Sequence, residues 1–372
     1  MRNTYALVNL KYLKENIEEI KSYYNGYKYY IGVIKGNGYG HGNRIASTLE
    51  MAGINYLACA TIEEAIDIRK YTSLPILCFG YVDILDIDYA INNNVTLSII
   101  SYDYYKELRK INKNIKVHLK LNTGMNRFGI KDKKQVKEIF DDIKNTNMEL
   151  EGIYTHLATS GITDVYYDKQ ISNFKELTSL IDLNSIKMVH LFNSMAVARH
   201  KKLDFDNTVR LGLMMYGFTY NIPGSTIGNL KRKIKLIGKN ISATTLTNNL
   251  KLKKVLSLYS DVVNINEVYP NEFVGYNAKY KVHNKEKIAV VCIGHADGVT
   301  SNYKKVVINN KFYDIVGYSM DYIMVKVDSS VKLHDTVTLI GDGITVGSIA
   351  GSDSPQHILV SISSRVYRKY EE

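Results

Sequence analysis

A lysine and a tyrosine in a glycine-rich segment are the first residues whose types and spacing indicate chemistry. Lys35 closes the apolar run YYIGVIK at 29–35, and Tyr39 follows it within VIKGNGYGHG at 33–42. The glycine spacing matches neither the dinucleotide-binding pattern G-x-G-x-x-G nor the phosphate loop G-x-x-x-x-G-K-S/T. A flexible glycine turn is the simplest interpretation of the glycines alone. A lysine that ends an apolar strand is costly to bury unpaired, so we expect Lys35 to have a partner or a chemical role.

Further residues with functional potential, most of them polar, stand at or just after the ends of later apolar runs. They are Arg127, His156, Asn193, Ser194, Arg210 and Gly212. In a parallel α/β barrel, the residues that follow the strands converge on one face, where the active site lies. We therefore expect these residues to share a site with Lys35.

The elements that would position them are eight short apolar runs that alternate with helix-like segments. The runs cover 29–35, 56–60, 75–80, 96–100, 116–121, 150–156, 188–193 and 208–212. Continuous apolar runs are typical of strands buried on both faces, and eight strand–helix units in succession are what a closed barrel needs. Among the helices, Gly53 is predicted to end one, and a Thr61–Glu64 capping box is predicted to begin another. The predicted fold is a TIM-like α/β barrel of eight parallel strands.

A mainly β domain is predicted to follow the barrel. After about residue 231 the sequence consists of strand-like runs separated by turn residues, with little helical periodicity. The opening segment TYALVNL at 4–10 is also strand-like and could join this domain. We therefore predict a barrel over 11–231 and a β domain over 232–372 that includes the strand within 1–10.

Composition and charge favour an ordinary globular protein over a nucleic-acid-binding or membrane protein. Apolar residues make up 45% and charged residues 23% of 372 residues, which is close to average soluble usage. The net charge is +11, but the basic residues are spread out, so no nucleic-acid partner is expected, whereas a positive field would attract an anionic ligand. No apolar run is long enough to span a membrane, and the N-terminus lacks a signal-peptide pattern, so a cytoplasmic protein without a membrane partner is expected. Cys59, Cys78 and Cys292 fit buried free thiols, and no metal-ligand grouping stands out.

The ordered motifs resemble those of the alanine racemase family over essentially the whole chain. The segment at 33–42 is similar to the family's signature for attachment of pyridoxal 5'-phosphate (PLP), with Gly36 in place of the usual alanine. Similar blocks follow in the family's order: HLKLNTGMNRFGI, GIYTHLATS, FNSMA, VRLGLMMYG, VGYNAKY, IGHADG and SMDY. The resemblance implies a PLP-dependent racemase of a small amino acid that works as a head-to-tail homodimer.

The resemblance also implies roles for residues. Lys35 matches the Schiff-base lysine, and its freed amine would be the base on one face of the substrate, with Tyr276 of the other subunit as the second acid–base group. Arg210 would hydrogen-bond the pyridine nitrogen and His156, and because a guanidinium stays protonated it would pass no proton to the ring. Arg127 would contact the cofactor and the substrate carboxylate.

The remaining matches concern binding. The residues implied to hold the cofactor are Lys35, Tyr39, Asn193, Ser194, Arg210, Gly212, Leu213 and Gln356. The residues implied to contact the substrate are Arg127, Met320, Asp321 and His295. Lys120 matches a lysine that the family often carries carbamylated, although a lysine in the alternating strand HLKLN could also point outward.

Departures from the family pattern bear on the substrate. Asn122 replaces an aspartate, and His295 replaces a tyrosine of the substrate entrance. Counting back from Arg365 places Gln356 where the family has an active-site tyrosine. An amide there can hydrogen-bond a hydroxyl, which would favour L-serine alongside or instead of L-alanine.

Two other functions stay open at this stage. A non-catalytic PLP-binding barrel resembles the first half but lacks a β domain with an equivalent of Tyr276. A decarboxylase of the same general fold would need a cysteine-based motif from its second subunit, and Cys292 lies in a strand-like run instead. Without its motif, Tyr276 could be one of many core tyrosines.

Overall fold

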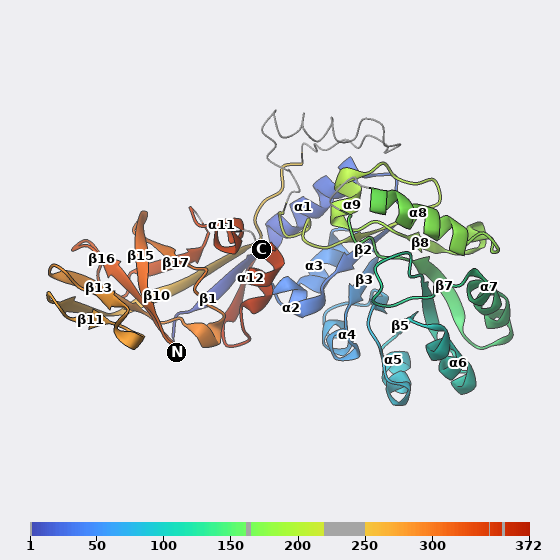
Figure 1. The fold of residues 1–372 in the computed structure, drawn as a ribbon, viewed down its shortest axis with the longest axis horizontal. Helices are drawn as coiled ribbons and strands as arrows, with labels where there is room; N and C mark the ends of the chain where they lie inside the picture. Colours follow the sequence, from blue (N-terminus) through green and yellow to red (C-terminus); the bar gives the residue numbers. More distant parts are fainter. Residues whose placement is uncertain (1, 161–164, 219–249, 342, 352–353) are drawn as a thin grey trace. The chain divides into compact units, whose positions relative to one another are not determined.

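A computed structural model describes residues 2–160, 165–218, 250–341, 343–351 and 354–372. The chain divides into two compact units, drawn in Figure 1. The first, here called the β unit, comprises residues 1–12, 36–42 and 254–372, and the second, the barrel unit, comprises 13–35 and 43–253. The predicted boundary between 231 and 232 falls outside the described residues.

The barrel unit contains the eight parallel strands that the apolar runs predicted. They are β2 (Tyr29–Val33), β3 (Tyr56–Cys59), β4 (Ile76–Cys78), β5 (Val95–Ile99), β6 (Lys116–Lys120), β7 (Glu149–Tyr154), β8 (Met188–His190) and β9 (Thr208–Leu211). Each strand from β2 to β7 pairs with the next along the chain, and β9 pairs with β2. A bridge between Asn193 and Arg210 joins the end of β8 to β9. The α/β-barrel prediction is confirmed.

Helices connect the strands of the barrel unit (Figure 1). They are α3 (Ile45–Met51), α4 (Ile62–Arg69), α5 (Ile87–Asn92), α6 (Tyr102–Ile111), α7 (Lys133–Asp142), α8 (Val165–Leu177) and α9 (Ser194–Arg199), preceded by α1 (Leu10–Tyr23). At the start of α4, Thr61 Oγ1 accepts a hydrogen bond from the Glu64 amide, as predicted. The Glu64 carboxylate accepts from the Ala60 amide at 2.7 Å, one residue before the position that a reciprocal capping box uses. Gly53 follows α3 with φ +84°, a conformation that favours glycine.

The β unit is built on an eight-stranded sheet of order β13-β16-β15-β14-β17-β10-β1-β18. Its strands are β1 (Tyr5–Asn9), β10 (Leu256–Val268), β13 (Glu286–Val291), β14 (Lys305–Ile308), β15 (Lys311–Tyr318), β16 (Ile323–Val327), β17 (Thr336–Ile340) and β18 (Tyr367–Glu371), beside a ribbon of β11 (Phe273–Val274) and β12 (Tyr280–Lys281). The opening strand does join this sheet: β1, blue in Figure 1, pairs with β10 and β18. The helices α11 (Val346–Ala350) and α12 (Pro355–Ser361) were not predicted.

No helix in the described parts of the chain combines the length and apolar character needed to cross a membrane. Within the same residues, no group of three or more His, Cys, Asp or Glu side chains is arranged to hold a metal ion.

Candidate functional site

The glycine-rich segment after β2 forms a left-handed turn, labelled α2 (Lys35–Tyr39). Gly36, Asn37 and Gly38 have φ of +63°, +53° and +62°, and Tyr39 continues at +51°. Left-handed backbone brings Cβ too close to the following carbonyl in most residues, whereas glycine and asparagine adopt it readily. The sequence GNG thus suits the left-handed backbone of this turn.

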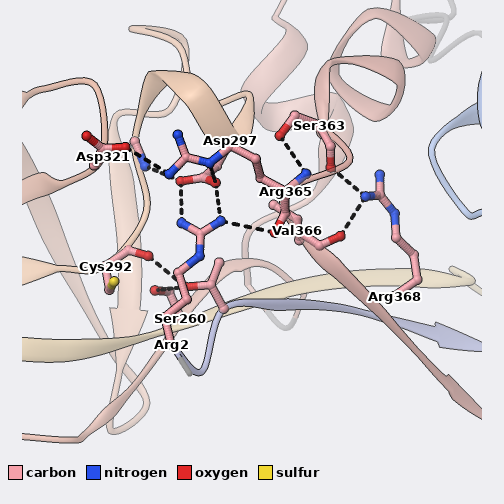
Figure 2. A network of polar contacts seen from close by, with 11 residues as sticks. Arg2, Ser260, Cys292, Asp297, Asp321, Ser363, Arg365, Val366 and Arg368 are labelled. Atoms are coloured by element: carbon pink, nitrogen blue, oxygen red, sulfur yellow. Dashed lines mark hydrogen bonds and ion pairs between the residues drawn. The ribbon is translucent and has the colours of Figure 1, made fainter.

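Close packing inside the β unit holds residues 36–42. A Cβ built on Gly40 would lie 2.1 Å from the carbonyl oxygen of Leu359 in α12, so only glycine fits. Arg368 donates to the Gly40 carbonyl at 3.1 Å and to carbonyls of the segment before β18, two of which are drawn in Figure 2. His41 is fully buried and bonds to backbone carbonyls of the turn, and burial lowers its pKa to about 4. His41 is therefore a structural residue.

Lys35 is the accessible amine of the barrel unit's candidate site. Its side chain is solvent-exposed, contrary to the expectation for a lysine at the end of an apolar strand. The reason is that β2 ends at Val33 and Lys35 already begins the turn. Partial burial and the nearby charge of Arg127 still lower the pKa of the Lys35 amine. A lysine that is both accessible and easier to deprotonate suits covalent chemistry.

Positive charges from several strands gather in this part of the barrel unit. Lys120 is 5% exposed, and burial together with Arg127, Arg210 and Lys35 lowers its pKa to about 8. The Lys120 ammonium lies 5.3 Å from the centre of the Tyr154 ring, so the side chain points inward. The same cations add to burial in lowering the pKa of His156 to about 3. Such a cluster favours a ligand with negative charge, because an anion relieves the mutual repulsion of the cations.

Arg210 is the most deeply held member of this cluster. It is 3% exposed, and its Nη1 and Nη2 atoms donate to the carbonyls of His190, Thr155 and Leu191 at 2.7–2.9 Å. Nη1 also contacts His190 Nδ1 at 2.9 Å. The expected hydrogen bond to His156 is thus corrected: the imidazole partner is His190, which ends β8 beside the Asn193–Arg210 bridge.

Asn122 explains how the loop that carries Arg127 keeps its shape. The Asn122 side-chain oxygen accepts from the amides of Gly124 and Asn126 at 3.2 and 3.0 Å. An amide oxygen serves this turn as well as a carboxylate oxygen, because both only accept. The replacement of aspartate by Asn122 therefore leaves the local fold intact.

Polar groups line the start of α9. The Asn193 side chain caps the helix by accepting from the Ala196 amide at 2.9 Å, and it donates to Ser160 Oγ at 3.2 Å. Ser194 Oγ accepts from the Gly212 amide at 2.7 Å. The structure therefore brings Asn193, Ser194 and Gly212 together, with Leu213 buried next in the chain.

The remaining candidates lie in the β unit. His295 and Ala296 donate from their amides to the carbonyls of Ser319 and Met320 at 3.0 and 2.9 Å. A Cβ on Gly294 would lie 2.6 Å from the Met320 carbonyl oxygen, so glycine allows this approach. The segments IGHADG and SMDY, which are distant in sequence, are thus hydrogen-bonded to each other and form one structural feature of the β unit.

An ion-pair network reinforces this feature (Figure 2). Asp297 is 1% exposed and is paired by Arg2 at 2.5 Å and approached by Arg365 at 3.5 Å. Arg365 also donates to Asp321 at 2.8 Å. The network therefore holds Asp321, a predicted substrate residue, in place beside Met320.

Two predicted residues of the β unit present exposed side chains. Tyr276 follows Gly275, whose φ is +75°, and its side chain is 71% exposed, so Tyr276 is not a core tyrosine. Gln356 lies in the first turn of α12 and is exposed. Because α12 also contacts Gly40 through Leu359, Gln356 belongs to the helix that packs on the turn after Lys35.

Sequence reasoning missed the polar residues inside the barrel. His118, Glu151, Tyr154 and His190 are all buried and joined by polar or ring contacts. A signal was present, because a histidine and a carboxylate inside apolar strand runs are rarely buried without a partner. Barrel interiors are usually filled by branched apolar side chains, so these four polar residues were not predicted to meet there.

Comparison with known proteins agrees with this geometry. Residues 8–220 match the family model described as alanine racemase, N-terminal domain, and residues 255–370 match alanine racemase, C-terminal domain. The alanine racemase of Clostridium kluyveri is 33% identical, with 99% of this chain and 94% of that protein aligned. The structures of alanine racemase from Bacillus anthracis, with bound L-Ala-P, and from Clostridium difficile 630 are 31% and 32% identical, each with a TM-score of 0.87 over 100% of this chain and 96% of theirs. The chain belongs to the alanine racemase family of isomerases.

Proposed function

We propose that this chain interconverts L-alanine and D-alanine with PLP by a two-base mechanism in a head-to-tail homodimer. The observation that carries the proposal is the accessible Lys35 amine, which belongs to a cluster of cations with Lys120, Arg127 and Arg210. An amino-acid carboxylate and a phosphate are both anions that such a cluster attracts.

The donor set of the barrel unit fits PLP. Lys35 offers an amine for covalent attachment, and Arg210 offers a buried guanidinium. Ser194 and the Gly212 amide, which lie within hydrogen-bond distance of each other, are proposed to bind the phosphate. Asn193, Leu213, Tyr39 and Gln356 complete the proposed cofactor contacts. Bound PLP would supply an electron sink that makes the α-proton of an amino acid removable.

Two acid–base groups on opposite faces of the substrate are needed to invert its α-carbon. Lys35 is proposed as one, because its lowered pKa leaves more neutral amine near neutral pH than a free lysine has. Tyr276 of a second subunit is proposed as the other, and its 71% exposure on its own chain leaves the phenol accessible to a partner. His156 is proposed to help Tyr276 lose its proton.

Arg210 and Arg127 are proposed to orient the reactants. Arg210 is held by three backbone carbonyls and an imidazole, and even with a pKa lowered to about 10 by burial it remains protonated at neutral pH. A fixed cation that only donates would face the cofactor ring without transferring a proton, which disfavours transamination. Arg127 is proposed to bind the substrate carboxylate, with Met320, Asp321 and His295 near the substrate.

Lys120 is proposed to be carbamylated. Only a neutral amine attacks CO₂, forming an N–C bond and releasing one proton, and a pKa of about 8 leaves part of Lys120 neutral at pH 7–8. The resulting negative carbamate would offset the charges of Arg127 and Arg210, whose repulsion lowers the Lys120 pKa.

Serine is the second substrate we propose. The exposed amide of Gln356 offers a hydrogen-bonding group on α12, the helix that packs on the turn after Lys35. A Gln356→Tyr variant should lower the serine-to-alanine ratio of kcat/KM. An unchanged ratio would refute this role of Gln356.

The deciding experiment gives the purified, PLP-loaded protein L-alanine and L-serine separately in D₂O. D-enantiomer formation and α-deuterium incorporation are followed, with Lys35→Ala and Tyr276→Phe as variants. Turnover that both variants lose supports the two-base mechanism. Bound cofactor without turnover of any amino acid would instead indicate a PLP-binding protein.

A further inference from the structure

A line of buried polar side chains crosses the inside of the barrel unit and ends at Arg210. Tyr56 on β3 donates to Glu151 on β7 at 2.6 Å, and His118 on β6 contacts His190 on β8 at 2.9 Å. Neither pair joins neighbouring strands, so these contacts run through the barrel interior. Tyr56 and Glu151 lie near the beginnings of their strands, whereas His190 ends its strand. The line thus leads along the barrel towards Arg210.

Donor chemistry determines the direction of every hydrogen bond in this line. A guanidinium can only donate, so His190 Nδ1, 2.9 Å from Arg210 Nη1, must accept and its Nε2 must carry the proton. That Nε2–H faces His118 Nδ1 at 2.9 Å, which must therefore accept in turn. The His118 proton is left on Nε2, which has no hydrogen-bond partner among the described residues but lies 3.5 Å from Glu151 Oε2. The two hydrogen bonds therefore run from Arg210 to His118, and the last link, from His118 to the carboxylate, is an electrostatic contact.

Burial determines the charges of the line. Both imidazoles are fully buried, and desolvation together with Arg210 lowers the pKa of each, so they are neutral. Hydrogen bonds from Tyr56 and Lys187 and the proximity of His118 hold the pKa of the Glu151 carboxyl well below its usual range, so it is ionised. One positive and one negative charge are therefore connected by two neutral rings.

Packing restricts both rings to this arrangement. The Tyr154 ring stacks on His190 with centroids 4.7 Å apart and an interplanar angle of 4°. A Cβ on Gly152 would lie 2.6 Å from His118 ring atoms, so a glycine provides the room for this ring. Rings that cannot flip keep each nitrogen facing the same partner, and these partners select the tautomer. A polarised chain of this kind orients its terminal donor.

We propose that Glu151, His118 and His190 form a positioning relay that sets the orientation of the Arg210 guanidinium. None of the three needs to touch substrate or cofactor. In the loaded enzyme, the relay keeps Arg210 aimed at the place that the proposed function assigns to the cofactor ring, and that part of the inference rests on the proposed function.

The first test needs no cofactor, and it uses variants only to assign the signals. Long-range ¹H–¹⁵N NMR spectra of the apoprotein with ¹⁵N-labelled histidine report which ring nitrogen carries the proton, with assignment by His118→Gln and His190→Gln. We expect both rings as the neutral Nε2–H tautomer from pH 6 to pH 9. An Nδ1–H tautomer or a titrating ring at either position would overturn the relay, whether or not the protein is a racemase.

The second test removes the charge at the far end of the line. Glu151→Gln keeps the shape of the side chain but removes its charge. Outer-shell partners that orient metal ligands change activity about 10–100-fold when they are replaced, and by analogy we expect kcat to fall about tenfold, with KM within twofold. We also expect a shifted absorption band of the bound cofactor. Lys187→Gln is the matched control: it also removes a Glu151 contact, but Lys187 is 48% exposed, so little change is expected.

The outcomes separate a relay from a structural role. A folded Glu151→Gln protein with wild-type kcat and cofactor spectrum would overturn the proposal, as would equal effects of the two variants. If Glu151→Gln does not fold, His118→Gln takes its place with the same expectation. A protein with the expected tautomers and no racemase activity would refute the proposed function and leave the relay standing.

Discussion

Replacing Gly40 with alanine tests the contact that holds the turn after Lys35. Gly40 has φ +81°, a conformation that costs a residue with a Cβ about 1–2 kcal/mol. The new Cβ would also lie 2.1 Å from the Leu359 carbonyl oxygen, and overpacking of this kind costs about 1–3 kcal/mol because α12 must shift. We therefore expect Gly40→Ala to destabilise the β unit by about 2–5 kcal/mol.

Gly347→Ala is the matched control in the same unit. Gly347 lies in α11, and its added Cβ would meet only Thr345 Oγ1 at 3.8 Å, an ordinary contact. Alanine is favoured over glycine inside a helix by about 0.5–1 kcal/mol, so this variant should be neutral or slightly stabilised.

Thermal and urea unfolding measure the difference. Gly40→Ala should lower Tm by several degrees and shift the urea midpoint, while Gly347→Ala should leave both close to the wild type. PLP binding can be measured by the absorbance of the bound cofactor. It should weaken only in Gly40→Ala, because this substitution displaces the turn that begins at Lys35. Equal stabilities of the two variants would refute the view that Gly40 is required by its contact with α12.

Three further predictions concern the barrel unit. Gly152→Ala should cost about 1–3 kcal/mol in urea unfolding, because its Cβ would press on the His118 ring; an unchanged midpoint would contradict this packing. ¹³C-bicarbonate should give a carbamate NMR signal from Lys120 that fades below about pH 8 as the amine is protonated, and a signal that persists in Lys120→Arg would disprove the assignment. Burial raises the pKa of Asp206 to about 7, above its value in the unfolded chain, so the contribution of Asp206 to stability should decline between about pH 4 and 7. The Asp206→Asn variant should lose that decline. A pH profile of stability equal to that of the wild type would contradict this prediction.

Local patterns in the sequence were enough to predict most of the architecture. A strand buried on both faces needs a continuous apolar run, so all eight barrel strands could be located before their pairing was known. The glycines after Lys35 also indicated a turn, because glycine adopts left-handed backbone at no steric cost. The candidate residues at the strand ends followed from the barrel itself.

The same patterns could not supply the partners of these residues. Apolar periodicity shows which face of a strand is buried, but it does not show which side chain lies opposite across a barrel. Arg210 pairs with His190 instead of His156, and His190 on β8 contacts His118 on β6 across the intervening strand β7. Neither contact follows from the order of residues along one strand.

The sequence alone therefore determined the barrel, the β unit and the positions of Lys35, Tyr276 and Arg210, because motifs and periodicity are local properties of the chain. Only the tertiary structure decided that β1 pairs with β18, that α12 packs on the turn at 36–42, and that a carboxylate faces His118 inside the barrel. Each of these depends on residues far apart in the chain, and their packing and donor chemistry select one partner among many that the sequence would allow.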